Sequence, residues 1–400
     1  MEKTVCELFA GVGGFRLGLE TSSHEWNTVW ANQWEPGKKS QHAYDCYCKH
    51  FGISENHVNA DISQIEKSQI PNHNLLVGGF PCQDYSVARS LSGNHGINGK
   101  KGVLWWQIRD ILEAKRPPFV LLENVDRLLK SPSTQRGKDF GIMLACLAEL
   151  GYDAEWRVIN AADYGNTQRR RRVFIFAYNN TSKYYKKAND TNEMDIINTE
   201  GFFAKTFPIN RIFETNEISF NNQSIFDISE SFKFNFLNAG YLRGNNITTA
   251  TVEPIFEDPI PLKYLLEKSV DEKYYLNGNI EKWEYLKGSK KINRTSKTGH
   301  CYIFSEGPLS FPDDINKPAR TMLTSESSLN RSTHVIEDPQ NGRLRLLTPK
   351  EAERINGFDD DWTKTETMPH KFRYFCMGNA LVVPLITRLG KTLNKIFEAE

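Results

Sequence analysis

Short apolar runs recur along the first 180 residues, and most of them end at a glycine, an acid or another polar residue. Runs of this length between turn-forming residues are typical of buried strands. They predict strands at residues 4–9, 28–32, 75–77, 119–125, 152–160 and 173–176, and a further strand that ends at Asp61. Residues 16–20 and 104–114 have helical spacing instead, the second with Trp105 and Ile108 on one face. This alternation predicts an α/β fold with an open parallel sheet.

Residues suited to ligand binding follow the first three predicted strands. They are Phe9, Gly11, Gly13 and Gly14 after the first strand, Gln33 and Trp34 after the second, and Asp61 after the third. The carboxyl ends of parallel strands form the ligand crevice of an open sheet. The glycines let the backbone approach a ligand, the following helix start favours a carboxylate or phosphate, and the two aromatic rings could hold a purine. A glycine turn is as often only a tight connection, so both interpretations stay open.

A candidate nucleophile follows the run that ends in Gly78-Gly79, in the segment Phe80-Pro81-Cys82-Gln83. Pro81 fixes one backbone angle beside Cys82, which suits a reactive side chain held at a strand end. A small buried residue is the more common role for a single cysteine. The polar, basic segment 84–102 that follows has the composition of a lid or phosphate-binding loop, with a disordered surface loop as the alternative.

Two further strands carry charged residues at their ends. A carboxylate that follows an apolar run is costly to bury unless it is paired or protonated, so Glu123 is a candidate proton donor or half of a structural ion pair. Four arginines, 169–172, lead into the strand at 173–176. Because successive side chains of a strand point to opposite faces, we expect Arg170 and Arg172 to reach one pocket while Arg169 and Arg171 face away.

Length and composition indicate a globular protein of about two domains. The chain has 400 residues, a net charge of +1 and ordinary apolar and charged fractions. Its seven cysteines form no disulfide framework and its N-terminus reads as a strand, so we expect a reducing, cytosolic compartment. No apolar run approaches the roughly 20 residues of a membrane span. The spacing of His42, Cys46, Cys48 and His50 matches no usual zinc site, and we expect no metal.

The composition changes at about Tyr178, where Asn, Lys, Ser, Thr and aromatic residues replace the regular pattern until roughly residue 315. This change predicts a second domain. Basic and aromatic residues alternate in part of it, which favours nucleic-acid contact and an ordinary solvated surface about equally: Lys282, Trp283, Tyr285, Lys287, Lys290, Lys291, Arg294 and Lys297. Regular patterning returns with a helix predicted to start at Thr348-Pro349, and Gly378-Asn379-Ala380 is predicted to open a last helix at 383–397.

Six blocks in a fixed order give the sequence a strong resemblance to the DNA cytosine carbon-5 methyltransferases of prokaryotic restriction-modification systems. They are FAGVGGF at 9–15, Pro81-Cys82-Gln83, Glu123-Asn124-Val125, QRRRR at 168–172, RLLTPKE at 345–351 and Gly378-Asn379-Ala380. In that family these are, in turn, the S-adenosylmethionine loop, the nucleophile motif, the acid motif, the arginine motif, the block that supports the recognition domain and the block that closes the cofactor site. One triplet would be weak evidence, whereas six blocks in family order are specific.

The resemblance implies a mixed, mostly parallel Rossmann-like α/β sheet with a second, smaller target-recognition domain. Residues 1–180, completed by 376–400, would form the catalytic and cofactor-binding domain. Residues 181–325 would recognise the target, and residues 326–375 would connect the two domains.

The site residues implied by the resemblance fall into three sets. The catalytic set is Cys82, Glu123, Arg170 and Arg172. The set that binds S-adenosylmethionine is Phe9, Gly11, Gly13, Gly14, Gln33, Trp34, Asp61, Pro81, Leu104 and Asn379. The DNA-contacting set is Gln83, Ser86, Arg89, Lys100, Lys101, Arg320 and Thr321. The family commonly has an acid at the position of Gln33, so we expect a weaker contact to the ribose here.

The implied reaction transfers a methyl group from S-adenosylmethionine to carbon 5 of a flipped-out cytosine in a specific duplex DNA sequence, through a covalent Cys82 adduct. The implied partners are double-stranded DNA and a restriction endonuclease that acts on the same site without forming a stable complex, and we expect a monomer in the prokaryotic cytoplasm. A transfer RNA methyltransferase and a catalytically silent DNA-binding relative are the alternatives. The long middle domain favours DNA over transfer RNA, and the intact Cys82, Glu123 and Arg172 argue against a silent protein.

Overall fold

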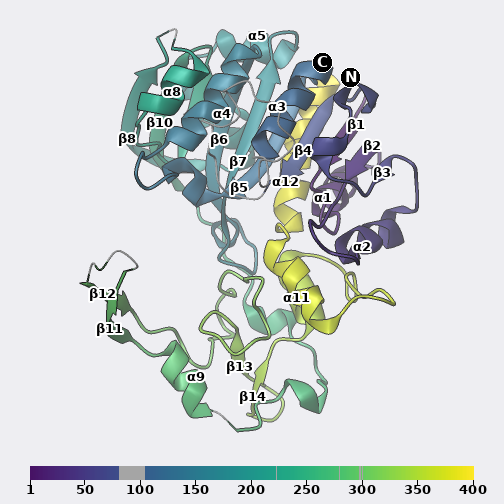
Figure 1. Ribbon diagram of the computed structural model, residues 1–400, viewed down its shortest axis with the longest axis vertical. Helices are drawn as coiled ribbons and strands as arrows, with labels where there is room; N and C mark the ends of the chain where they lie inside the picture. The colour runs from purple at the N-terminus through teal and green to yellow at the C-terminus, as the bar shows by residue number, and fades with distance from the viewer. Residues whose placement is uncertain (81–103, 222, 279, 297–298, 300) are drawn as a thin grey trace.

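A ten-stranded mixed sheet forms the centre of the computed structural model, which describes residues 1–80, 104–221, 223–278, 280–296, 299 and 301–400 (Figure 1). Five neighbouring strands are parallel: β3 (His57–Val58), β2 (Asn27–Asn32), β1 (Thr4–Leu8), β4 (Leu75–Gly79) and β5 (Phe119–Val125). The remaining five each run antiparallel to their neighbours: β7 (Arg171–Asn179), β6 (Tyr152–Asn160), β9 (Ala239–Arg243), β10 (Asn246–Pro254) and β8 (Ile209–Ser219). The predicted mixed α/β sheet is confirmed, and each strand expected in the first 180 residues is present.

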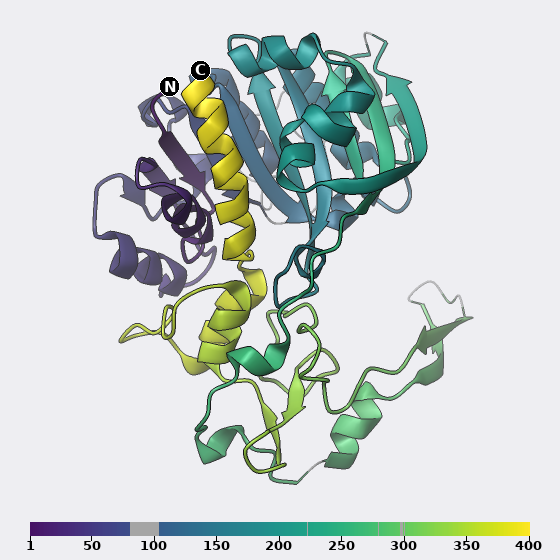
Figure 2. The same cartoon turned by 180° about the vertical axis from the view of Figure 1, so that it is seen from behind.

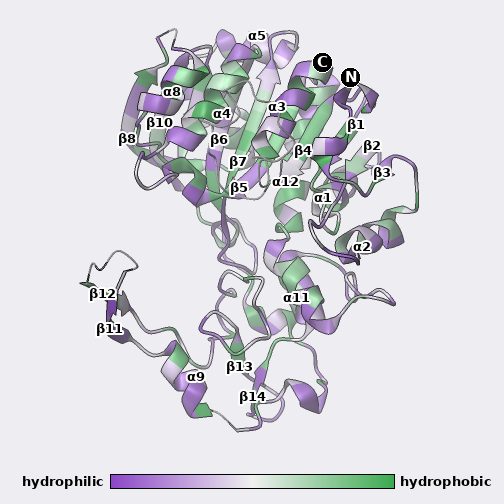
Figure 3. Ribbon diagram, in the orientation of Figure 1, coloured by the Kyte–Doolittle hydropathy of each residue, from purple (hydrophilic) through white to green (hydrophobic). Residues whose placement is uncertain are grey.

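Helices cover both faces of the sheet (Figures 1 and 2). One face carries α1 (Gly14–Ser22), α7 (Phe202–Thr206) and α12 (Val383–Ala399), and the other carries α3 (Leu104–Lys115), α4 (Lys138–Glu149) and α8 (Ile225–Ser231). Each face therefore has its own apolar core, and Figure 3 shows the hydrophobic strands between the two helix layers. Strands buried on both faces read as continuous apolar runs, which is why β1, β4 and β5 could be predicted. The other helices in the first 200 residues are α2 (His42–Phe51), α5 (Lys183–Asn189) and α6 (Glu193–Asp195).

The structure differs from the domain boundary predicted at residue 181. Strands β8, β9 and β10, within residues 209–254, extend the central sheet beyond β6 instead of belonging to a second domain. Gly240 of β9 lies against Trp156 of β6, so closely that a Cβ atom at this glycine would be 2.0 Å from the ring. Most residues of β8 are exposed, and buried positions of β9 and β10 are filled by small or polar residues such as Gly240, Thr248 and Thr249. None of the three strands therefore reads as an apolar run in the sequence.

A smaller part of the molecule lies beyond the ends of the central strands, on the side where β5 ends and β7 begins (Figures 1 and 2). It contains α9 (Ile280–Lys287), β11 (Lys290–Thr295), β12 (Cys301–Glu306), β13 (Val335–Glu337) and β14 (Leu344–Leu346). Two helices, α10 (Pro349–Asn356) and α11 (His370–Asn379), follow it along the chain and lead back to α12. None of the helices in the described part of the chain is long and apolar enough to span a membrane.

The start of α10 confirms the helix predicted at Thr348-Pro349. The Thr348 hydroxyl accepts a hydrogen bond from the Glu351 N–H at 3.2 Å, and the Glu351 carboxylate accepts one from the Thr348 N–H at 2.8 Å. These reciprocal bonds form a capping box. The last helix begins at Val383, as predicted, but Gly378 and Asn379 end the preceding helix α11 instead of opening the last one.

Candidate active site

An ion pair lies where β5 ends beside the start of β7. Arg172 Nε lies 2.8 Å from Glu123 Oε1, and the two side chains are 17% and 12% exposed. The register sets this contact: Val125 pairs with Arg172 and Glu123 with Phe174, so that the two charged residues are diagonal neighbours. On the opposite side, a Cβ atom at Gly79 of β4 would lie 3.3 Å from Glu123 Oε2. One carboxylate oxygen is thus paired, and the other faces the end of β4.

Asn124 connects this carboxylate to the segment that carries the predicted nucleophile. Its Nδ2 donates a hydrogen bond to the Phe80 carbonyl at 2.9 Å, and its Oδ1 accepts one from the Val125 N–H at 2.8 Å. The backbone just before Pro81 is therefore fixed beside Glu123. Several predicted site residues lie outside the described residues: Pro81, Cys82, Gln83, Ser86, Arg89, Lys100 and Lys101.

Arg170 is buried and binds two backbone carbonyls instead of joining the Glu123–Arg172 pair. It donates hydrogen bonds to the Met322 carbonyl at 3.1 Å and to the Gly378 carbonyl at 2.9 Å. Burial, and then the nearby charge of Arg172, lowers the pKa of Arg170 to about 9, which still leaves it charged at neutral pH. The predicted pairing of Arg170 and Arg172 in one pocket is not what the structure shows, because the end of α11 and the smaller part of the molecule provide closer acceptors for Arg170. Its contacts position β7, the smaller part and α11 relative to one another.

Gln168 forms a second buried link across the same junction. Its Oε1 accepts a hydrogen bond from the Met322 N–H at 3.1 Å, and its Nε2 donates one to Asn356 Oδ1 at 2.7 Å. The sequence interpretation did not single out this residue. The available signal was its place at the head of the arginine block, where a neutral polar side chain precedes four cations.

The conformation of the glycine turn after β1 is set by positive backbone φ angles and by a hydrogen bond to a neighbouring side-chain amide. Phe9, Gly11 and Gly13 have positive φ values of 54°, 57° and 87°. The Gly11 N–H donates a hydrogen bond to Gln33 Oε1 at 2.7 Å. Gly13 provides no side-chain cap for α1, and of the first N–H groups that of Arg16 donates to Glu7 Oε1 at 3.4 Å, so only part of the helix start is left for a negatively charged group. A Cβ atom at Gly14 would lie 2.9 Å from Leu381 Cδ1, which shows that the segment before α12 closes over this turn.

The other residues predicted to bind the cofactor lie around the same end of the parallel strands. Trp34 follows β2 and is 37% exposed, and Asn379 is exposed at the end of α11. Asp61 follows β3 and accepts a hydrogen bond from the Ser63 N–H at 2.9 Å. Leu104 is the first residue of α3. Asn32, which the sequence interpretation missed, is buried and donates hydrogen bonds to the carbonyls of residues 58 and 60, and so fixes the chain that leads to Asp61.

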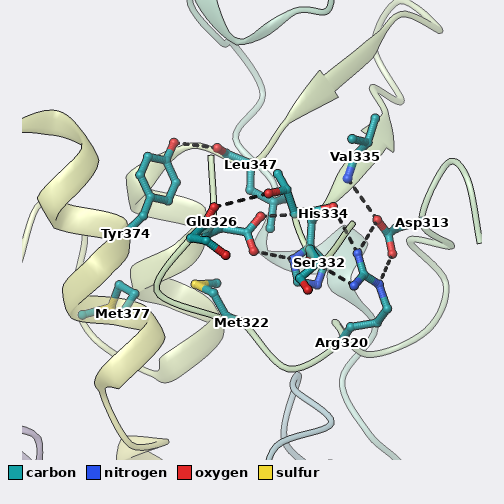
Figure 4. A network of polar contacts seen from close by, with 12 residues as sticks. Asp313, Arg320, Met322, Glu326, Ser332, His334, Val335, Leu347, Tyr374 and Met377 are labelled. Atoms are coloured by element: carbon teal, nitrogen blue, oxygen red, sulfur yellow. Dashed lines mark hydrogen bonds and ion pairs between the residues drawn. The ribbon is translucent and has the colours of Figure 1, made fainter. Parts of the chain in front are cut away.

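Arg320 does not offer its charge to DNA in this structure, in contrast to the prediction. Its Nε and Nη2 lie 2.6 and 3.0 Å from the two carboxylate oxygens of Asp313, and its Nη1 donates to the Ser332 carbonyl at 3.0 Å (Figure 4). Burial opposes the ionised form of Asp313, but hydrogen bonds and charge from Arg320 hold the pKa of this carboxyl below its ordinary value. The Thr321 hydroxyl donates to the Arg169 carbonyl. Both residues therefore hold the smaller part together or attach it to the sheet.

The alternative of a zinc site finds no support among the described residues, where no three potential ligands gather. The Cys46 thiol donates a hydrogen bond to the Trp362 carbonyl at 3.4 Å, and the His50 ring stacks on the Trp362 ring at 3.6 Å. These side chains instead attach α2 to the segment between α10 and α11.

A family model described as C-5 cytosine-specific DNA methylase matches residues 3–395. The chain belongs to this family. It is 55% identical over 400 residues to the Type II methyltransferase M.Sau3AI of Staphylococcus aureus, covering 98% of this chain and 95% of that protein. It is also 27% identical over 389 residues to the Type II methyltransferase M.SsoII of Shigella sonnei, covering 97% and 79% of the two chains.

The fold agrees with that of solved relatives. A mutant of the Spodoptera frugiperda protein DNMT2 superposes with a TM-score of 0.62 at 16% identity, covering 98% of this chain and 99% of that one. As a C-5 cytosine-specific DNA methylase, the protein transfers a methyl group to carbon 5 of cytosine in DNA. The predicted family, fold and enzyme activity are confirmed, and the transfer RNA alternative is not favoured.

Proposed function

We propose that the protein uses S-adenosylmethionine to methylate a cytosine in a specific duplex DNA sequence, with Cys82 as nucleophile and Glu123 and Arg172 as the groups that bind the base. The observation that carries this proposal is the Glu123–Arg172 pair, held by Asn124 beside Phe80, two residues before Cys82. A carboxyl group and a guanidinium at one point can bind a ring nitrogen and a ring carbonyl of a single base.

The chemistry explains why these residue types are needed. Carbon 5 of cytosine is a poor nucleophile until a group adds to carbon 6, and the Cys82 thiolate would form that carbon–sulfur bond. Glu123 would donate a hydrogen bond or proton to ring nitrogen 3, while Arg172 would hold the ring carbonyl. After carbon 5 is methylated, a base removes its proton, the electron pair re-forms the ring double bond and the Cys82 sulfur leaves. The base has to leave the duplex stack for these steps.

The residues after β1, β2 and β3 fit the methyl donor. The N-terminus of α1, where Gly13 provides no capping side chain, suits its carboxylate, and the exposed Trp34 ring suits its purine. When bound, S-adenosylmethionine would supply an electrophilic methyl group on a positively charged sulfur. The residues of this chain would orient it: the turn at Gly11 and Gly13 by close backbone approach, and Asn379 from the end of α11.

We further propose that residues beyond Pro254 select the DNA sequence, because β8–β10 belong to the sheet and the residues around the strand ends are accounted for by cofactor and chemistry. The relatives named above are Type II methyltransferases of bacteria, which supports a partner restriction endonuclease that acts on the same site. We expect the methyltransferase to act as a monomer in the cytoplasm and to form no stable complex with that nuclease.

Target DNA with fluorine at carbon 5 of the cytosine tests the proposed chemistry. Fluorine cannot leave as a cation, so methylation should proceed while release of the cysteine is blocked. We expect a denaturation-resistant complex that requires S-adenosylmethionine and whose cross-linked peptide contains Cys82. Cys82→Ser should form none, because a hydroxyl is far less ionised than a thiol at neutral pH. Cys48→Ser is the matched control and should be trapped like the unmodified enzyme. Attachment through another cysteine, or trapping of Cys82→Ser, would refute the assignment.

A further inference from the structure

The hairpin formed by β11 and β12 projects from the smaller part of the molecule as a separate two-stranded ribbon (Figures 1 and 2). Its register pairs Lys290 with Glu306 at one end and Thr295 with Cys301 at the other. Within the described part of the chain these strands pair only with each other. Isolated two-stranded hairpins are marginally stable in water, so this hairpin requires contacts with the rest of the protein at its base. Its exposure also calls for a functional explanation.

Two cations, the buried Lys287 and the partly exposed Arg331, support the base of the hairpin. Lys287, at the end of α9, lies 3.4 Å from Asp313 and also donates to the Thr333 carbonyl. Arg331 donates to the carbonyls of residues 286, 287 and 288 before β11, and to the Gly307 carbonyl after β12. The start of β11 and the end of β12 are thus both attached to the rest of the smaller part. The basic residues of this region therefore have separate roles, since Lys287 is structural and is not a surface cation.

The two faces of the hairpin differ in exposure and in whether they carry an acid. On one face Lys290, Ile292, Phe304 and Glu306 are partly buried, and Lys290 donates to the Leu286 carbonyl of α9. We call the other side the open face, and all six of its residues are exposed: Lys291, Asn293, Thr295, Cys301, Ile303 and Ser305. The open face has one cation, Lys291, and no acid, whereas the other face has two cations, Lys290 and Arg294, and one acid, Glu306.

Ile303 is the apolar residue of the open face that most needs an explanation, because it is 67% exposed at the middle of β12. Its direct partner in the register is Asn293, and the next pair on the same face is Lys291 with Ser305. An exposed apolar group beside an amide, a hydroxyl and an ammonium group matches the groups at base edges in the major groove of DNA. Thymine presents a methyl group there, and each base pair presents hydrogen-bond donors and acceptors.

We propose that the open face of the β11–β12 hairpin lies in the major groove of the target DNA, with Asn293, Ile303 and Ser305 against base edges and Lys291 directed to the phosphates. This assignment deepens the proposed function and rests on it. The major groove is about 12 Å wide and admits a two-stranded ribbon. The six residues of each strand span about 20 Å, enough to follow several base pairs. The absence of acids from the described open face avoids repulsion from the phosphates.

Methylation of a random duplex library, read by sequencing that detects 5-methylcytosine, tests the assignment. The double variant Asn293→Ala/Ile303→Ala should still methylate DNA but should accept other bases at one or two positions of the site. Each lost base contact should lower kcat/KM on the preferred sequence by about 5- to 150-fold. The matched control is Asn216→Ala/Phe213→Ala, which removes an amide and a 56% exposed apolar side chain from strand β8. The control should keep the original site. Unchanged specificity of the hairpin variant, or equal relaxation in the control, would overturn the proposal.

A cross-linking measurement separates this proposal from the proposed chemistry. Ile303→benzoylphenylalanine should cross-link to the bases of bound duplex DNA, and Phe213→benzoylphenylalanine should not. The cross-link requires DNA binding but no methyl transfer, so failure of the Cys82 assignment would leave it intact. Base cross-linking from position 213 but not from position 303 would overturn the hairpin assignment even in a fully active enzyme.

Discussion

Gln33 supports the glycine turn after β1 by accepting the Gly11 N–H at 2.7 Å. The sequence indicated only that an amide stands where the family commonly has an acid. The structure adds that this side chain lies at the turn itself, whereas the nearby Glu35 accepts a hydrogen bond from the Ala43 N–H of α2 at 3.2 Å. Glu35 therefore cannot replace the missing acid at the turn.

Gln33→Glu should tighten binding of S-adenosylmethionine. The carboxylate keeps the bond to the Gly11 N–H, and it offers a ribose hydroxyl a charge-assisted acceptor about twice as strong as the neutral one. We expect a gain of roughly 1 kcal/mol, about fivefold in Kd, measured by calorimetry. Gln33→Ala removes the acceptor of the Gly11 N–H and should weaken binding. Unchanged or weaker binding by the glutamate variant would place the ribose away from residue 33.

The contacts of Arg170 and Arg172 show what the sequence alone could not predict about individual residues. Arg172 and Arg170 stand in one block, and alternation along a strand correctly predicted that Arg169 and Arg171 are exposed. It could not show that Arg172 meets Glu123 while Arg170 binds carbonyls contributed by residues 322 and 378. Those acceptors are more than 150 residues away in the chain. Their proximity depends on how the smaller part and α11 are placed against the sheet, which no local pattern encodes.

The close packing of α1 against α12 joins the two ends of the chain (Figure 2). Gly18 makes this contact possible, since a Cβ atom there would lie 2.5 Å from Ile386 Cβ and 3.1 Å from the Val383 carbonyl oxygen. Both of those atoms belong to or adjoin the α12 backbone and cannot rotate away. We expect the end of the chain to complete the catalytic domain, and the contact of Gly18 with α12 allows this expectation to be tested.

Gly18→Ala should lower the free energy of unfolding by about 1–3 kcal/mol, because the added methyl group overpacks the helix contact. In an open helix the same change would stabilise by roughly 0.5–1 kcal/mol, so the sign of the effect reports on the packing. Denaturant unfolding of the full chain measures it. Gly307→Ala is the control, since a Cβ atom at Gly307 meets nothing within 4 Å, and its stability should stay near that of the unmodified protein. Stabilisation by Gly18→Ala would show that α1 and α12 are not in close contact.

Strands that consist of apolar runs were predictable, and strands that are exposed or contain small and polar residues were not. Strands β1, β4 and β5 read as apolar runs because helices cover both sides of them. In β8, an edge strand, Phe213 is by contrast 56% exposed, and Arg211, Glu214 and Glu217 interrupt the apolar residues. The helix α11 was also missed, because Gly378 was predicted to open the last helix, whereas it lies in α11 and packs against the chain at Thr324, whose backbone nitrogen would be 2.3 Å from an added Cβ.

The molecule as a whole divides later in the chain than its composition suggests. The change at about Tyr178 falls at the end of β7, within the antiparallel part of the sheet, and the smaller part begins only after β10 ends at Pro254. Asp153 of β6 illustrates the continuity: its carboxylate accepts hydrogen bonds from the Gly244 N–H at 2.8 Å and the Tyr241 hydroxyl at 3.2 Å. A cut at residue 181 would separate these partners.

Two chimeras that differ only in their first boundary test this division. In one, residues 255–325 are replaced by the equivalent segment of a family member that methylates a different sequence, and in the other residues 181–325 are replaced. Both should adopt the donor's specificity, because we place sequence selection beyond Pro254. Only the longer exchange replaces β8, β9 and β10, and with them the contact between Gly240 and Trp156 and the bonds to Asp153. It should therefore melt at a lower temperature than the shorter one, in a thermal scan with and without S-adenosylmethionine. If the shorter chimera kept the original site while the longer one changed it, residues 181–254 would take part in recognition. Equal melting temperatures of the two chimeras would show that β8–β10 are exchangeable as a unit.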